Sequence, residues 1–245
     1  MATPASTDSL TFDYIIVGAG SAGCALASRL TEDPDVTVAL LEAGPHDHHF
    51  SVWVPAGCAA SLPFKNQRNY AYETVPQPGL GGRQGYQPRG RGLGVSSSLN
   101  AMIYIRGTHH DYDHWASLGC TVWNWDNVLP YFKRAECNER LAGRDDDPLH
   151  GGTGPLHVSD LRTGNPFIGR FVDAAAAAGY PRNQDFNGPE QEGVGAYQVT
   201  QYNGERWNAA RAYLHGGDKS DTTFNRGRRE LTVLPDTLAQ RIVFE

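Results

Sequence analysis

Three glycines near the N-terminus carry the clearest chemical signal in this chain. An apolar run, Tyr14–Val17, is followed by Gly18, Gly20 and Gly23 in the order GxGxxG. Gly18 permits a tight turn, Gly20 lets the backbone approach a pyrophosphate, and Gly23 allows a helix to pack closely on a sheet. The unpaired N–H groups and the positive dipole end of that helix would meet the phosphate charge. The spacing therefore predicts a dinucleotide site.

The neighbouring elements are those that such a site needs. Residues 21–30, rich in Ala and Leu, predict a helix, and a second apolar run ends on Glu42. A carboxylate about 20 residues past the glycines accepts hydrogen bonds from a ribose. It fits the unphosphorylated ribose of FAD or NAD and would repel the 2′-phosphate of NADP. The pattern predicts two parallel strands joined by a helix, and it leaves FAD and NAD both open.

Composition excludes several other classes of protein. The chain has 245 residues, enough for one large or two small domains, and a net charge of -6. Without a clustered basic patch we expect no nucleic-acid binding, and Arg226, Arg228 and Arg229 are predicted to lie in a solvated loop. No apolar run is long enough to span a membrane. Residues 1–10 lack the basic and apolar regions of a secretory signal, so we expect a cytoplasmic protein.

The cysteines and histidines predict no metal site. The four cysteines are far apart and form no CxxC pair, so we expect reduced thiols. Two groups of histidines could hold a metal ion: His46, His48 and His49 beside Asp47, and His110 with His114. The first run is common in surface loops and no further ligand spacing supports it. The second pair shares one face of a helix, where a half-exposed polar surface is the simpler interpretation.

A second patterned block runs through residues 89–113. Gly90, Gly92 and Gly94 are followed by three serines at 96–98 and then by Asn100. Such a segment offers backbone N–H groups and hydroxyls at short range. This suits a loop that lies against a ligand's phosphates or ring edge.

Together with the first glycine motif and the sequence Glu-Ala-Gly at 42–44, this block resembles the N-terminal part of the glucose-methanol-choline (GMC) oxidoreductases. These are FAD-dependent alcohol oxidases and dehydrogenases. Later segments match the family in the same order: residues 113–136, 150–156, 185–195, 206–214 and 231–244. The resemblance covers nearly the whole chain from Phe12 onward. Within the family, the sequence is similar to the choline-dehydrogenase-like and polyethylene-glycol-dehydrogenase-like branches.

The resemblance implies a set of cofactor-binding residues and a reaction. The cofactor would be FAD, held by Gly18, Gly20, Ser21, Gly23, Glu42, Ala43, Arg91, Gly94, Ser96, Asn100, Ala101, Met102, Ile103 and Ala239. The glycines and Ser21 would hold the pyrophosphate, and Glu42 the adenosine ribose. Residues 100–103 would pass the isoalloxazine ring, and Ala239 would lie near the adenine. The substrate would be a small primary alcohol, oxidised to an aldehyde by hydride transfer to flavin N5.

Three features of the chain depart from the family pattern. Relatives with covalent FAD carry a histidine where this chain has Leu99, so FAD is expected to be non-covalent. Val95 and Val122 stand where relatives have glycines. A β-branched residue at positive φ costs about 1–3 kcal/mol. Weakened FAD binding is therefore a hypothesis for Val95.

The catalytic pair, a histidine with a second His or Asn, lies far C-terminal in the family, and we expect no catalytic residue in this chain. The predicted fold is α/β: a Rossmann-like FAD-binding domain with the start of an α+β substrate domain, C-terminally incomplete. We assign residues 1–11 to a flexible tail, 12–150 to the FAD-binding domain and 151–230 to part of the substrate domain. Residues 231–245 are expected to return to the FAD-binding domain, and 231–244 predict a strand, a turn and another strand.

An incomplete sheet would expose an unpaired edge, and a C-terminal complementing chain is a possible partner. The alternatives are a non-catalytic flavin-binding or partner-docking module and a two-nucleotide disulfide reductase. The reductase would need a second GxGxxG and a redox cysteine pair, and the chain has neither.

Overall fold

A small parallel sheet combines two strands from the N-terminal part of the chain with one strand from its C-terminal part. The computed structural model describes residues 10–141, 143–162, 165–217 and 223–244. Its main sheet has the order β1-β2-β9, formed by Tyr14–Val17, Val38–Leu41 and Leu231–Leu234. Both pairings are parallel, with Tyr14 opposite Val38 and Val38 opposite Leu231. Most of the predicted tail and part of the predicted loop at 216–227 lie outside the described residues.

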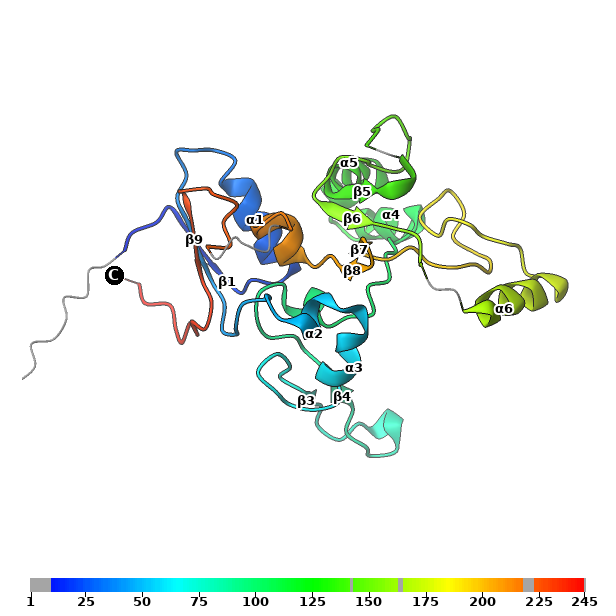
Figure 1. Ribbon diagram of the computed structural model, residues 1–245, viewed down its shortest axis with the longest axis horizontal. Coiled ribbons are helices and arrows are strands. Elements are labelled where there is room, and N and C mark those ends of the chain that lie inside the picture. Colours follow the sequence, from blue (N-terminus) through cyan, green and yellow to red (C-terminus); the bar gives the residue numbers. More distant parts are fainter. Residues whose placement is uncertain (1–9, 142, 163–164, 218–222, 245) are drawn as a thin grey trace, which may run out of the picture.

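Helix α1 (Ser21–Leu30) connects β1 to β2, as the sequence predicts, and covers one face of the sheet (Figure 1). The π-helix η6 (Ala210–Leu214), orange in the same view, packs beside α1 although it lies about 180 residues further along the chain. Cys24 of α1 is fully buried in this core, and burial raises the pKa of its thiol. The thiol is therefore a packing group, as predicted.

Two basic residues of the expected solvated loop have structural contacts: the exposed Arg226 donates to Ala212 O at 3.5 Å, and Arg228 makes shorter contacts. The Arg228 guanidinium donates hydrogen bonds to Ser28 O (2.6 Å) and Thr31 Oγ1 (3.2 Å), at the C-terminal end of α1. A cation is favourable there because the last helix carbonyls carry the negative end of the dipole. The prediction of a solvated loop is thus wrong for Arg228, whereas Arg226 and Arg229 are exposed.

The final predicted strand does not form. After β9 the chain turns at residues 235–236, where Asp236 has a φ of +53°, and 237–244 have no regular structure. The backbone N–H groups of Asp236 and Thr237 instead donate to Gly44 O and Glu42 O. A strand needs a partner along its edge, and among the described residues this segment has none. It therefore runs along the loop that follows β2.

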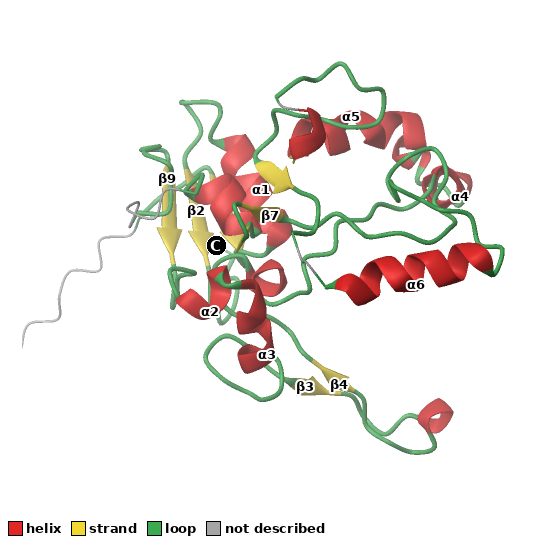
Figure 2. Ribbon diagram, turned by 45° about the vertical axis from the view of Figure 1, so that its right-hand side comes forward, coloured by secondary structure: helices red, strands yellow, loops and turns green. Residues whose placement is uncertain are grey.

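The remaining elements lie outside this sheet. They are α2 (Phe50–Trp53), η1 (Pro55–Gly57), α3 (Cys58–Ser61), β3 (Tyr72–Glu73), η2 (Pro78–Leu80), β4 (Tyr86–Gln87), η3 (Val95–Ser98), α4 (His109–Ser117), η4 (Thr121–Trp123), α5 (Trp125–Ala135), β5 (Glu136–Asn138), η5 (Glu139–Leu141), β6 (Leu156–Val158), α6 (Pro166–Ala177), β7 (Gln201–Tyr202) and β8 (Glu205–Arg206). Elements α2, α3, β3 and β4 are grouped together, apart from the group of α4, α5, β5 and β6, and α6 lies at the outer side of the molecule (Figure 1 and Figure 2). The sequence also predicts a strand at 155–158 and a helix at 166–179, and the structure has β6 and α6 there. Within the described ranges, the helices are too short or too polar to cross a membrane.

Candidate cofactor site

The first glycine loop has the shape that the sequence predicts. Gly18 has a φ of +99°, which only glycine adopts readily. A Cβ on Gly23 would lie 2.0 Å from Gly18 O, so the helix approaches the strand too closely for any side chain. Gly20 is the N-cap of α1 and no side chain caps the helix. The first N–H groups of α1 are thus left for an anion.

Glu42 lies at the centre of three converging segments. Its buried carboxylate accepts three backbone hydrogen bonds of 2.9 Å, from Ala19 to Oε2 and from Gly44 and Gly92 to Oε1. The carboxylate thereby joins the first glycine loop, the segment after β2 and the Gly-rich block.

The Gly-rich block packs directly on the first loop. The Gly94 N–H donates to Ala19 O at 2.8 Å, and Arg91 donates to Ala43 O at 2.8 Å. A Cβ on Gly44 would lie 2.3 Å from Gly92 N, so these two backbones need glycine to approach. Residues that are more than 45 positions apart in sequence are therefore brought together at one edge of the sheet.

Val95 has the strained backbone that its sequence position raised as a question. Its φ is +44°, in the left-handed region that disfavours β-branched residues. A Cβ on Gly20 would lie 3.7 Å from the Val95 Cβ and Cγ2, so the valine faces the phosphate loop. Val122, in contrast, is 69% exposed and has no positive φ. Of the two departures from the glycine pattern, the one at Val95 carries strain.

The expected flavin segment is shaped by Asn100. Its Oδ1 accepts from Met102 N at 3.0 Å, and Met102 has a φ of +65°. Ala101 and Ile103 are exposed on either side of the buried Met102. Strained backbone of this kind clusters at ligand sites.

The other predicted residues lie around this centre. Ser96 Oγ accepts from Gly90 N at 3.3 Å, and Ser21 is exposed at the start of α1. Leu99 is buried. Ala239 is exposed in the segment that follows β9.

Arg206 is a site residue that the sequence reasoning missed. It is 1% exposed and donates to Val52 O, Ser97 O and Asn100 Oδ1 at 2.8–3.1 Å. Burial lowers the pKa of its guanidinium. Arg206 therefore holds the Gly-rich block in place through Ser97 and Asn100. The sequence around Arg206 does not indicate these contacts, because the partners lie more than 100 residues away.

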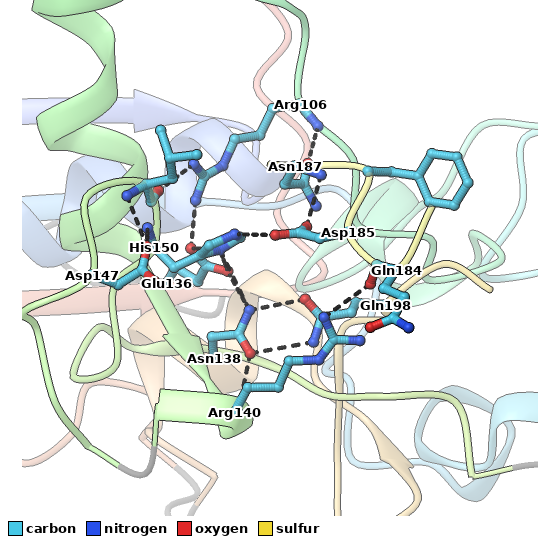
Figure 3. A network of polar contacts seen from close by, with 12 residues as sticks. Arg106, Glu136, Asn138, Arg140, Asp147, His150, Gln184, Asp185, Asn187 and Gln198 are labelled. Atoms are coloured by element: carbon cyan, nitrogen blue, oxygen red, sulfur yellow. Dashed lines mark hydrogen bonds and ion pairs between the residues drawn. The ribbon is translucent and has the colours of Figure 1, made fainter. Parts of the chain in front are cut away.

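A second polar network ties the block to later segments (Figure 3). His150 Nδ1 lies 3.0 Å from Glu136 Oε1, and its Nε2 lies 2.9 Å from Asp185 Oδ2. Glu136 also forms an ion pair with the Arg106 guanidinium. The backbone N–H of Arg106 donates to Asn187 Oδ1. Burial disfavours the charged imidazole, but the hydrogen bonds that it donates to both carboxylates outweigh this and raise the pKa of His150 to about 9. The imidazolium bridges two segments that are 49 residues apart in sequence (136 to 185).

Comparisons with known proteins agree with this geometry. The chain is 46% identical over 234 residues to an alcohol dehydrogenase (acceptor) of Pseudomonas putida, covering 96% of this chain and 40% of that protein. It is 43% identical over 241 residues to the mitochondrial choline dehydrogenase of Homo sapiens, covering 96% and 38%. The chain thus spans about two fifths of the length of these relatives.

Solved structures give the same result. The pyridoxine 4-oxidase of Mesorbium loti superimposes with a TM-score of 0.81 at 36% identity, over 92% of this chain and 42% of that chain. A formate oxidase of Aspergillus oryzae, studied for its FAD modification, gives a TM-score of 0.78 at 26% identity, over 98% and 41%. The GMC oxidoreductase family model matches residues 12–245. The chain therefore belongs to the GMC oxidoreductase family.

Proposed function

We propose that this chain forms the FAD-binding part of an enzyme that oxidises a primary alcohol to an aldehyde. Members of the family bind FAD, and the matched relatives include alcohol and choline dehydrogenases. The observation that carries the proposal is the convergence of the first glycine loop, Glu42 and the Gly-rich block at the uncapped start of α1. When bound, FAD supplies the group that accepts the hydride.

The start of α1 fits a pyrophosphate. A Cβ on Gly20 would meet only Val95, at an ordinary contact distance of 3.7 Å, so a ligand group can approach the Gly20 backbone where a side chain would otherwise lie. The free N–H groups of the first turn provide the donors that phosphate oxygens need.

Glu42 fits a ribose hydroxyl. An ionised carboxylate offers about four lone-pair positions. Three are used by backbone N–H groups, two on Oε1 and one on Oε2. One position on Oε2 is left to accept from a hydroxyl, and the other three contacts hold it in place.

The cofactor is non-covalent in this proposal, because Leu99 offers no nucleophile at the position where the resemblance expects a covalent histidine. The proton of the alcohol would be taken by a base outside this chain, in a further segment supplied by the same or another polypeptide. The structure of this chain supports a role in binding and orienting the cofactor. It does not identify which alcohol is the substrate.

Gly20→Ala tests the proposal sharply. Gly20 has a φ of -74° and an added methyl has ordinary contacts only, so stability without FAD should stay within about 0.5 kcal/mol of the parent. The methyl would occupy the pyrophosphate approach, and FAD affinity should fall about tenfold, or 1.4 kcal/mol. Quenching of flavin fluorescence during a titration measures the affinity, and denaturant unfolding measures the stability.

Gly79→Ala is the matched control, since its Cβ would meet nothing within 4 Å. Equal FAD affinity of parent and Gly20→Ala would contradict the proposed pyrophosphate site. Bound flavin that primary alcohols fail to reduce, even after a complementing C-terminal chain is added, would favour the non-catalytic module.

A further inference from the structure

A buried cluster of metal-ligating side chains lies outside the residues assigned to FAD. Asp47 and His48 follow β2, whereas His215 comes directly after η6. One ligand atom from each of the three lies within 4.8 Å of the other two. The side chains of Asp47 and His215 are fully buried, although they are 168 residues apart in sequence.

The cluster has more acceptors than donors. Asp47 Oδ2 accepts from Asn208 at 3.0 Å and lies 3.2 Å from His215 Nε2. Asp47 Oδ1 and His215 Nδ1 have no hydrogen-bond partner within the described ranges. A buried acceptor without a donor costs about 1–3 kcal/mol. A cation bound by the Asp47 carboxylate would compensate the cost at Oδ1, because it attracts both carboxylate oxygens.

The spacing suits ligands of one metal ion. Tetrahedral zinc has bonds of about 2.0–2.1 Å to imidazole nitrogen and carboxylate oxygen, which places neighbouring ligand atoms roughly 3.3 Å apart. The observed Oδ2 to Nε2 distance is 3.2 Å, so an ion between these two atoms would replace their hydrogen bond with little movement of either side chain. Asn208 donates a hydrogen bond to the Asp47 carboxylate. Metal ligands are commonly oriented by such a neighbouring hydrogen-bond partner.

The surroundings would favour a bound ion. The His48 ring lies 5.4 Å from the Trp53 ring and 5.0 Å from the Phe224 ring, between centroids. Such apolar walls keep water away and strengthen the attraction between a cation and its ligands.

We propose that Asp47, His48 and His215 bind one divalent transition-metal ion of the zinc type. The ion ties the segment after β2 to the end of η6. Through Asn208, which also donates to Ser98 Oγ at 2.8 Å, it supports the Gly-rich block. The prediction of no metal site depended on the lack of a further ligand near residues 46–49, and His215 supplies that ligand from a distant segment.

Calorimetric titration of the chelator-treated 245-residue chain with ZnCl₂ tests this site. We expect one ion per chain and a higher unfolding temperature with Zn²⁺ present, because an ion that binds only the folded state stabilises it. His48→Gln and His215→Gln should each weaken binding roughly tenfold or more. Absence of binding, or unchanged affinity in both variants, would show a buried ion pair only.

His110→Gln is the matched control. His110 and His114 lie on α4 with ring centroids 6.1 Å apart, and they are another histidine pair that could attract zinc. Loss of the tight site in this variant would overturn the proposal. If the buried His215→Gln protein does not fold, X-ray absorption of the zinc-loaded His110→Gln protein decides, because the His110–His114 pair is broken there. Two imidazoles in a nitrogen and oxygen shell support the site, and a shell with sulfur or without imidazole refutes it.

Discussion

At the scale of single residues, Val95 stands out because its backbone and its side chain both oppose the expected function. It combines a β-branched side chain with a φ of +44° and faces the Gly20 backbone. Strain of this kind costs about 1–3 kcal/mol, although glycine recovers only part of it because it loses more entropy on folding. We therefore expect the residue to limit stability and to restrict access to the first glycine loop.

We expect Val95→Gly to raise the free energy of unfolding by about 1 kcal/mol and to tighten FAD binding. Denaturant unfolding and FAD titration measure the two effects. Val122→Gly serves as the control, since Val122 is exposed without positive φ and its replacement should not stabilise the chain. A Val95→Gly protein that binds FAD no better than the parent would remove the steric hypothesis.

At the scale of elements, two buried charges join segments that the local sequence does not connect. Arg206 holds residues 97–100 and the backbone at Val52, and His150 joins β5 to the loop at 185. Each contributes through hydrogen bonds to groups that would otherwise be buried without a partner.

Arg206→Met should lower the free energy of unfolding by about 3 kcal/mol, because three acceptors lose their donor. Chemical denaturation measures this loss. Arg170→Met on the exposed side of α6 is the comparison, with an expected change below about 0.5 kcal/mol. Similar values for the two variants would mean that water replaces the Arg206 contacts.

The His150 bridge makes stability depend on pH. The pKa of His150 is raised from 6.5 to about 9 in the folded chain, so its contribution is complete below pH 6.5 and is lost as pH rises through 9. Since the Asp185 side chain is one-third exposed and solvent screens it, we expect a loss of about 2 kcal/mol. Urea unfolding between pH 6 and 10 measures it, relative to His150→Gln. Parallel pH profiles for the two proteins would contradict the bridge.

At the scale of the whole molecule, the main sheet has two edge strands, β1 and β9, of which β1 is the more exposed. Within the part of the chain that the structure describes, β1 pairs only with β2, and Tyr14, Ile15 and Val17 are 50–63% exposed. An apolar strand with an unpaired edge is prone to associate. This chain spans about two fifths of its relatives, so further sequence is available in those proteins to cover such an edge.

Ile15→Lys should therefore reduce self-association of the 245-residue chain. Sedimentation at increasing protein concentration would show oligomers for the parent and a shift toward monomer for the variant. Leu118→Lys, at an exposed position after α4, controls for the added charge. A parent chain that stays monomeric throughout would refute the open edge.

The sequence alone determined the β1-α1-β2 unit and the Glu42 position, because these depend on spacings within about 30 residues and on local periodicity. It also determined the family, because several motifs follow one another in the family's order along the chain. Only the tertiary structure decided the contacts of Arg206 and His215, whose partners lie more than 100 residues away. It also decided the left-handed backbone at Val95 and the absence of a strand after residue 234. Those outcomes depend on which distant backbones meet, and composition and spacing carry no information about such contacts.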